Sequence, residues 1–78
     1  MFYTYVLKSS KDGDLYIGFS KDLKNRLIEH NKGLVPATKD SRPFKIVYYE
    51  ACLSYTKAVE REKSLKTGFG RAYLKRRI

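Results

Sequence analysis

Two short runs near the amino terminus alternate between apolar or aromatic and polar positions, which is the period of a β-strand. Residues 2 to 8 read FYTYVLK and residues 15 to 19 read LYIGF, and both are dense in the aromatic and β-branched types that favour strands. The segment SSKDGD between them places Gly13 at a turn position. The pattern therefore predicts a β-hairpin.

After the hairpin the apolar positions follow a helical period. The positions on that face are Leu23, Leu27 and Ile28. Ser20 is a suitable N-cap and Gly33 is a suitable residue to end the helix. We expect a first helix over roughly residues 21 to 32.

The rest of the chain predicts a loop, a strand and two more helices. Residues 33 to 43 carry two prolines and no period, which indicates a surface loop. The run FKIVYYEAC predicts a third strand. Ser54 can cap a second helix over residues 55 to 66, and Gly68 and Gly70 break it before a short basic helix.

These elements follow one another in the order β-β-α-β-α-α. The order indicates an α/β protein of the α+β type, with a small three-stranded, mainly antiparallel sheet flanked by helices. At 78 residues we expect one domain, residues 1 to 78, with too small a core for an internal ligand cavity. Any chemistry should therefore lie in a surface groove.

The composition argues against several kinds of structural link and partner. Cys52 is the single cysteine, so neither an internal disulfide nor a thiolate zinc cluster is available. No apolar run approaches the roughly 20 residues that span a bilayer, and no leader pattern is visible. We expect a protein of the reducing cytoplasm without a membrane partner.

The net charge of +9 is large for so small a surface and favours polyanions. Residues 55 to 78 hold eight basic and two acidic residues, against nine and six in residues 1 to 54, so the carboxyl-terminal third is the expected backbone-contacting face. The alternative is that the lysines only solvate a small protein.

Three polar residues on the helices are candidates for chemistry. Arg26 and His30 lie one turn apart, on the expected side away from Leu23 and Leu27, and taken alone they fit a solvated face better than a site. Glu62 lies on the apolar stripe of the second helix, a stripe formed by Tyr55, Ala58, Val59 and Leu65. A carboxylate there needs a cation, a metal or water, and an ion pair within the chain is as good an explanation as function.

The hairpin holds a further candidate pair. Tyr5 and Tyr16 come from adjacent strands, and Gly18 removes a side chain from the face of Tyr16. A missing side chain lets another backbone or a ligand approach.

Together these segments resemble the GIY-YIG nuclease superfamily, and in particular its small single-domain bacterial members. The matching segments are YTY at 3 to 5, YIG at 16 to 18, DLKNRLIEHN at 22 to 31 and AVEREKSLK at 58 to 66. Tyr3 and Thr4 stand where the first triplet of the family has Gly and Ile. No Asn follows Asn31, so the late asparagine that some members have near the scissile phosphate has no counterpart here, and Lys63 or Lys66 is the candidate substitute.

The resemblance implies a metal-dependent endonuclease with five catalytic residues: Tyr5, Tyr16, Arg26, His30 and Glu62. Glu62 would hold one Mg²⁺ or Mn²⁺, and Arg26 would clamp the phosphate. Tyr5 or Tyr16 would take a proton from water, with nearby cations lowering the phenol pKa, and His30 would orient a tyrosine or protonate the leaving group. The expected nucleic-acid contacts are Arg26, Lys63, Lys66, Arg71, Lys75, Arg76 and Arg77.

Two other classes of function stay open. One is a nucleic-acid-binding module that does not cut, and the other is a nuclease subunit that depends on a protein partner for specificity. DNA is favoured over RNA as substrate, and the sequence gives no oligomeric state.

Overall fold

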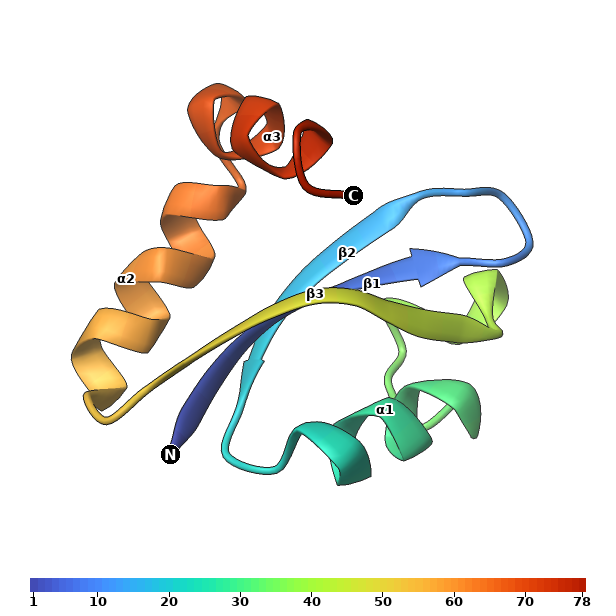
Figure 1. Ribbon diagram of the computed structural model, residues 1–78. Coiled ribbons are helices and arrows are strands. Elements are labelled where there is room, and N and C mark those ends of the chain that lie inside the picture. The colour runs from blue at the N-terminus through green and yellow to red at the C-terminus, as the bar shows by residue number, and fades with distance from the viewer.

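A computed structural model describes residues 1–78 and contains a small sheet with helices on both of its faces (Figure 1). The elements are β1 (Phe2–Ser9), β2 (Leu15–Ser20), α1 (Leu23–Asn31), the 3₁₀ turn η1 (Lys39–Ser41), β3 (Phe44–Cys52), α2 (Tyr55–Leu65) and α3 (Gly68–Lys75). The predicted order β-β-α-β-α-α and the α+β class are confirmed. Only η1, inside the predicted loop, is additional.

The three strands form one antiparallel sheet in the order β2-β1-β3. The central strand β1 is the most buried, and its Tyr5 lies opposite Gly18 of β2 on one side and Tyr49 of β3 on the other. Both β2 and β3 are therefore edge strands, and each leaves one row of backbone groups unpaired by the sheet.

Alternate residues of β1 supply two separate cores, one on each face of the sheet. Tyr5 and Leu7 pack with Phe44 and with the apolar side of α1. Val6, from the opposite face, packs with Leu65 of α2 and Leu74 of α3. The small core expected from the length is thus divided into two thin layers, and one sheet separates α1 from α2 and α3 (Figure 1).

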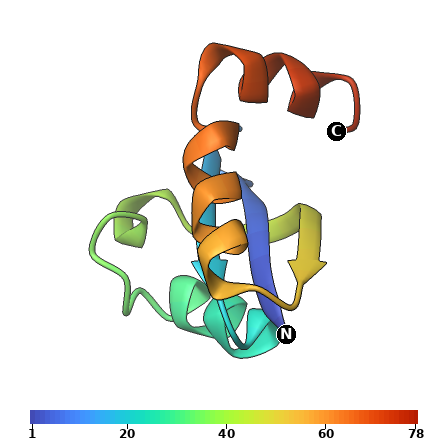
Figure 2. The same cartoon turned by 90° about the vertical axis from the view of Figure 1, so that its left-hand side faces the viewer.

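Helix α3 lies crosswise at the end of α2 (Figure 2). Gly70 makes this close crossing possible, because a Cβ on it would lie 2.5 Å from the carbonyl carbon of Leu65. Gly70 is therefore a packing residue inside α3, and the prediction that it breaks a helix is wrong. Thr67, which accepts a hydrogen bond from the Gly70 N–H, is the N-cap of α3.

Three further details differ from the sequence-based prediction. Helix α1 begins at Leu23, and its N-cap is Asp22, since the Ser20 hydroxyl closes the turn before it. Ile28 and Tyr55 were expected in buried stripes but are 41% and 56% exposed. Tyr55 is the first residue of α2, where the helix is only beginning to meet the sheet, so its ring packs edge-on against Phe19 at the margin.

Other local predictions are confirmed. Gly13 and Gly33 have positive φ angles of 79° and 78°, at the hairpin turn and just after α1. Ser54 caps α2 by accepting a hydrogen bond from the Lys57 N–H.

The helices of the structure are all too short or too polar to span a lipid bilayer.

Candidate active site

A surface groove of about 890 Å³ runs along the free edge of β2. Five consecutive β2 residues, 15 to 19, form its floor, so side chains from both faces of the sheet open into it. Residues of α1 and the 33–43 loop form one wall, and residues of α2 and α3 form the other. The five predicted catalytic residues all line this groove: Tyr5, Tyr16, Arg26, His30 and Glu62.

Tyr5 belongs to the central strand, and it reaches the groove across Gly18. A Cβ on Gly18 would lie 2.5 Å from Cζ and 2.6 Å from Cε2 of the Tyr5 ring, and closer still to its hydroxyl oxygen. The space predicted at Gly18 is therefore occupied by the Tyr5 side chain and not by a ligand. The glycine of YIG is what allows the tyrosine of the neighbouring strand to reach the edge.

The Tyr5 hydroxyl lies between two groups of α1. It is 2.9 Å from Nε2 of His30, and Nε of Arg26 donates to it at 3.4 Å. Arg26 also pairs with Glu29, at 3.6 Å between the charged atoms. Tyr5, Arg26 and His30 thus form one hydrogen-bonded cluster.

The side of α1 that was expected to face solvent turns inward at its end. His30 is 5% exposed, packs its ring against Tyr5 and Phe44, and is the buried residue of α1. Arg26 is half-buried. The solvated-face interpretation is therefore wrong for His30, because Tyr5 of β1, Phe44 of β3 and Thr38 of the following loop enclose its ring.

Burial decides the protonation of this cluster. It raises the pKa of Tyr5, and the hydrogen bond and charge of Arg26 offset only part of that rise. Burial, helped by the positive charge of Arg26, lowers the pKa of His30. Arg26 does lower the pKa of the Tyr5 phenol, as expected of a neighbouring cation, but burial outweighs it, so the resting state is a neutral phenol beside a neutral imidazole.

Tyr16 is held differently. Its hydroxyl lies 3.0 Å from Oγ of Ser41 in η1, and its ring packs edge-on against Phe44. No hydrogen bond links it to Arg26 or His30. The two tyrosines therefore line the same groove with different partners.

Glu62 is half-buried, as predicted, with 22% of its side chain exposed. Its carboxylate accepts a hydrogen bond from Nζ of Lys66 at 3.0 Å, an i,i+4 pair on α2. The ion pair within the chain is therefore present, and both partners line the groove. Glu62 also contributes to raising the pKa of Tyr5, which lies on the opposite wall.

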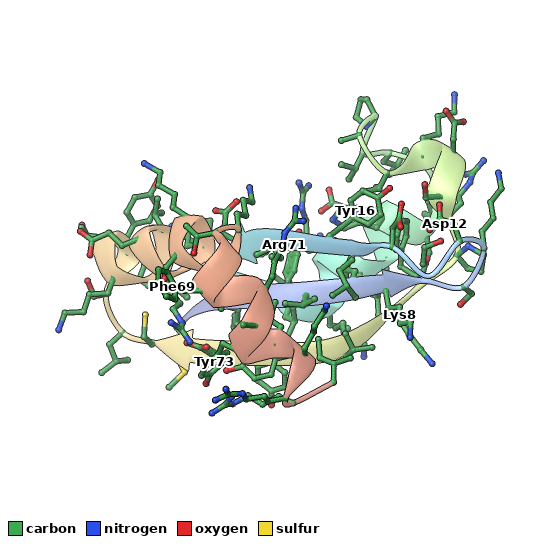
Figure 3. The ribbon with its side chains drawn as sticks, turned by 90° about the horizontal axis from the view of Figure 1, so that it is seen from above. Lys8, Asp12, Tyr16, Phe69, Arg71 and Tyr73 are labelled. Atoms are coloured by element: carbon green, nitrogen blue, oxygen red, sulfur yellow. The ribbon has the colours of Figure 1, made fainter.

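The basic residues divide into two sets. Lys66, Arg71 and Lys75 line the groove with Arg26, whereas Lys63, Arg76 and Arg77 lie outside it. Figure 3 shows Arg71 reaching from α3 toward β2, with Tyr16 further along. Lys75 therefore lies in the same groove as Tyr5, Arg26 and Glu62, because α3 crosses over the end of the groove.

A polar network outside the groove joins α3 to β3 and α2. The Tyr73 hydroxyl lies 3.0 Å from that of Tyr48, which donates to Glu50 at 2.6 Å. Arg61 donates to both carboxylate oxygens of Glu50 at 3.0 Å, and the Arg77 guanidinium lies 3.5 Å from the centre of the Tyr73 ring. Tyr73 therefore ties α3, which presents Arg71 and Lys75, to β3, and Arg77 covers the ring of Tyr73.

The sequence interpretation missed three residues that hold the site together. The hydroxyl oxygen of Thr38 lies 2.7 Å from Nδ1 of His30. The hydroxyl of Ser41 forms a hydrogen bond with that of Tyr16. The Asn31 side chain accepts a hydrogen bond from the Phe44 N–H at 2.7 Å and donates one to the Phe44 carbonyl at 3.1 Å. These two bonds tie α1 to β3. Thr38 and Ser41 lie in an aperiodic loop, where spacing carries no signal.

The chain is thus a small basic α+β domain with these side chains gathered in a groove at the edge of its sheet. The model of the GIY-YIG catalytic domain matches residues 1–76, so the chain belongs to the GIY-YIG family, whose nucleases act on nucleic acid.

The chain is also similar to curated bacterial proteins. The chain is 42% identical over 66 residues to the UPF0213 protein of Staphylococcus saprophyticus, and 39% identical over 66 residues to those of Staphylococcus epidermidis and Staphylococcus aureus. Each match covers 83% of this chain and 79% of the relative. No solved structure matches the chain.

Proposed function

We propose that this protein is a metal-dependent endonuclease that hydrolyses phosphodiester bonds of nucleic acid in the β2-edge groove. The observation that carries the proposal is the convergence of Tyr5, Tyr16, Arg26, His30 and Glu62, from four different elements, on one basic groove. Hydrolysis needs a positioned water, a proton acceptor and positive charge near the phosphate oxygens, and these side chains offer each of them.

Arg26 is the residue suited to hold the scissile phosphate. Its guanidinium is always charged, and its planar fork matches two phosphate oxygens at once. The bond to Tyr5 uses only Nε, so the terminal nitrogens, apart from the long contact with Glu29, are available for a phosphate. The hydrogen bond to Tyr5 also raises the pKa of Arg26 further.

Tyr5 is better placed than Tyr16 to take the proton of the attacking water. The phenol of Tyr5 is neutral at rest, so it can accept a proton only while it passes its own to Nε2 of His30. In this step the water proton moves to the Tyr5 oxygen, the Tyr5 proton moves to Nε2, and His30 becomes an imidazolium. Tyr16, bonded to Ser41, has no such acceptor and serves to shape the groove.

Glu62 would hold the divalent ion, Mg²⁺ or Mn²⁺. No group of three or more acidic, histidine or cysteine side chains forms a ready-made cage, and a hard ion bound through one carboxylate takes its other ligands from water and phosphate. Lys66 is exposed and flexible enough to move from Glu62 to a phosphate, so the residues present fit such an ion. The ion would supply positive charge to the phosphate in the transition state.

The test is cleavage of single-stranded, duplex, flapped and branched DNA and RNA by purified protein with Mg²⁺ or Mn²⁺. Tyr5→Phe and Glu62→Gln should reduce the rate at least about 100-fold, in the range seen for general acid-base groups. Glu60→Gln is the matched control, because Glu60 is an exposed carboxylate of the same helix outside the groove.

The outcomes separate the candidate functions. Equal cleavage in EDTA contradicts the metal role, and an inactive Glu60→Gln variant contradicts the site. Tight binding without cleavage of any substrate favours the non-cutting module, and cleavage that appears only with an added protein favours the partner-dependent subunit.

A further inference from the structure

Thr38 is the buried polar residue of the 33–43 loop that the proposed reaction does not use. It is 3% exposed, and its Oγ1 lies 2.7 Å from Nδ1 of His30. Its own backbone is fixed on both sides, since its N–H donates to the Val35 carbonyl at 3.1 Å and its carbonyl accepts from the Ser41 N–H at 3.1 Å. The hydroxyl is therefore held in place against the imidazole.

His30 contacts Tyr5 through one ring nitrogen and Thr38 through the other. The surroundings of the Tyr5 hydroxyl determine which group donates in each hydrogen bond. The Tyr5 phenol is 3% exposed, and the two side chains that contact its oxygen are Arg26 and His30. Arginine has donors only, so the phenol proton points at Nε2 of His30, and that nitrogen carries no proton. In neutral His30 the proton then resides on Nδ1, which donates to Thr38.

The Thr38 hydroxyl has a place for its own proton. It accepts from Nδ1 of His30 and donates to the Val35 carbonyl at 3.4 Å. The sequence of donors and acceptors thus runs from Tyr5 through His30 and Thr38 to a backbone carbonyl, with no buried side-chain polar atom left unpaired.

We propose that Thr38 is a positioning residue that holds His30 in the tautomer protonated on Nδ1, so that Nε2 is free to accept the proton of Tyr5. The tautomer itself does not depend on catalysis, whereas its consequence for the reaction rests on the proposed function. When Nε2 takes the proton, Nδ1 keeps its proton and its bond to Thr38, so the ring does not have to turn.

The groups that act on His30 are few. From β1 it faces the Tyr5 phenol, from its own helix it faces the charges of Arg26 and Glu29, and β3 presents the ring of Phe44. Arg26 and Glu29 influence the charge of the ring but contact neither of its nitrogens. Thr38 is therefore the side chain that accepts the proton of Nδ1, while Tyr5 contacts Nε2, and the two contacts favour the same tautomer.

His30 is the single histidine of the chain, which makes the test direct. In protein labelled with ¹⁵N at histidine, a long-range ¹H–¹⁵N spectrum above pH 7 should show a protonated Nδ1 and an unprotonated Nε2. Thr38→Val removes the hydroxyl at nearly constant volume and should move the ring toward the other tautomer. Thr38→Ser should keep the parent spectrum.

Activity gives the second readout. Thr38→Val should lower kcat about 10- to 100-fold, as loss of a residue that orients a histidine does, with KM changed less than threefold, and Thr38→Ser should restore most of it. If the valine variant does not fold, the parent spectrum and Thr38→Ala carry the same test.

A parent spectrum with the proton on Nε2, or the same tautomer in parent and Thr38→Val, overturns the proposal. A tautomer change without a change in kcat overturns the positioning role alone. A parent protein with the expected tautomer that cleaves no substrate contradicts the proposed function and leaves the tautomer assignment standing.

Discussion

Gly18 offers the sharpest test of how the site is assembled, because Tyr5 reaches the groove only across it. Gly18→Ala places a methyl group 2.5 to 2.6 Å from carbon atoms of the Tyr5 ring. Carbon atoms in contact prefer about 3.5 to 4.0 Å, so the ring must move by roughly 1 Å or more. The ring is packed against the core on the α1 face and is 3% exposed, so it has little room to move.

Two terms set the size of the effect. Forcing an extra methyl group into a packed core costs about 1 to 3 kcal/mol. Displacing the phenol also weakens its contacts with His30 and Arg26, each worth about 1 kcal/mol. We expect Gly18→Ala to lower the free energy of unfolding by about 2 to 4 kcal/mol, which for a domain of this size lowers Tm by roughly 10 to 20 °C.

Urea and thermal denaturation of Gly18→Ala beside Gly68→Ala measure this effect. A Cβ on Gly68 meets nothing within 4 Å, so alanine there should be neutral or stabilise by about 0.5 to 1 kcal/mol. In a Tyr5→Leu background, where no ring crosses the glycine, the penalty for alanine at position 18 should largely disappear. If Gly18→Ala is as stable as Gly68→Ala, or if its penalty is unchanged beside Tyr5→Leu, the packing argument is refuted.

Two further predictions concern pH and salt. Because burial lowers the pKa of folded His30 below 6.5, the unfolded chain binds a proton first as pH falls, so stability should drop from about pH 6.5 toward the folded pKa. Urea titrations from pH 7.5 to 5.5 should show this loss in the parent but not in His30→Asn, and parallel curves would contradict it. For salt, replacing groove residues Arg71 and Lys75 by Gln should flatten the log-log dependence of nucleic-acid binding by roughly one unit per lost contact. The same change at Arg76 and Arg77, outside the groove, should flatten it less, and equal slopes would place the backbone contacts elsewhere.

The fold was largely predictable because each element carries its own local signal. Alternation marked the strands, and the helical period with Ser54 as cap marked α2. The errors lie where two signals compete over one short segment. Ser20 and Asp22 are both good caps, and only the pairing of Ser20 with Tyr3 in the sheet leaves the cap to Asp22. Glycine commonly interrupts a helix, but Gly70 lies inside α3, where its lack of a side chain allows α2 to pack closely.

The sequence predicted which residues form the site, but it did not predict the hydrogen bonds between them or how deeply they are buried. The motif spacing named Tyr5, Arg26 and His30, and all three line the groove. Their mutual contacts depend on how deeply α1 sits on the sheet, which no period records. For this reason the sequence placed His30 toward solvent, and it did not predict that burial would outweigh the effect of Arg26 on the Tyr5 pKa. Thr38, eight residues after His30 in an aperiodic loop, had no signal at all.

The position of the groove at an edge strand explains how side chains from both faces of the sheet reach one site. Inside a sheet, side chains of opposite faces are separated by the backbone, but at the free edge of β2 they open into a common space. Arg26 and His30 come from the α1 face, while Glu62 and Arg71 come from the face covered by α2 and α3. In the proposed reaction, a carboxylate and a phenol–imidazole pair would therefore approach one phosphate from opposite sides, each anchored in its own core layer.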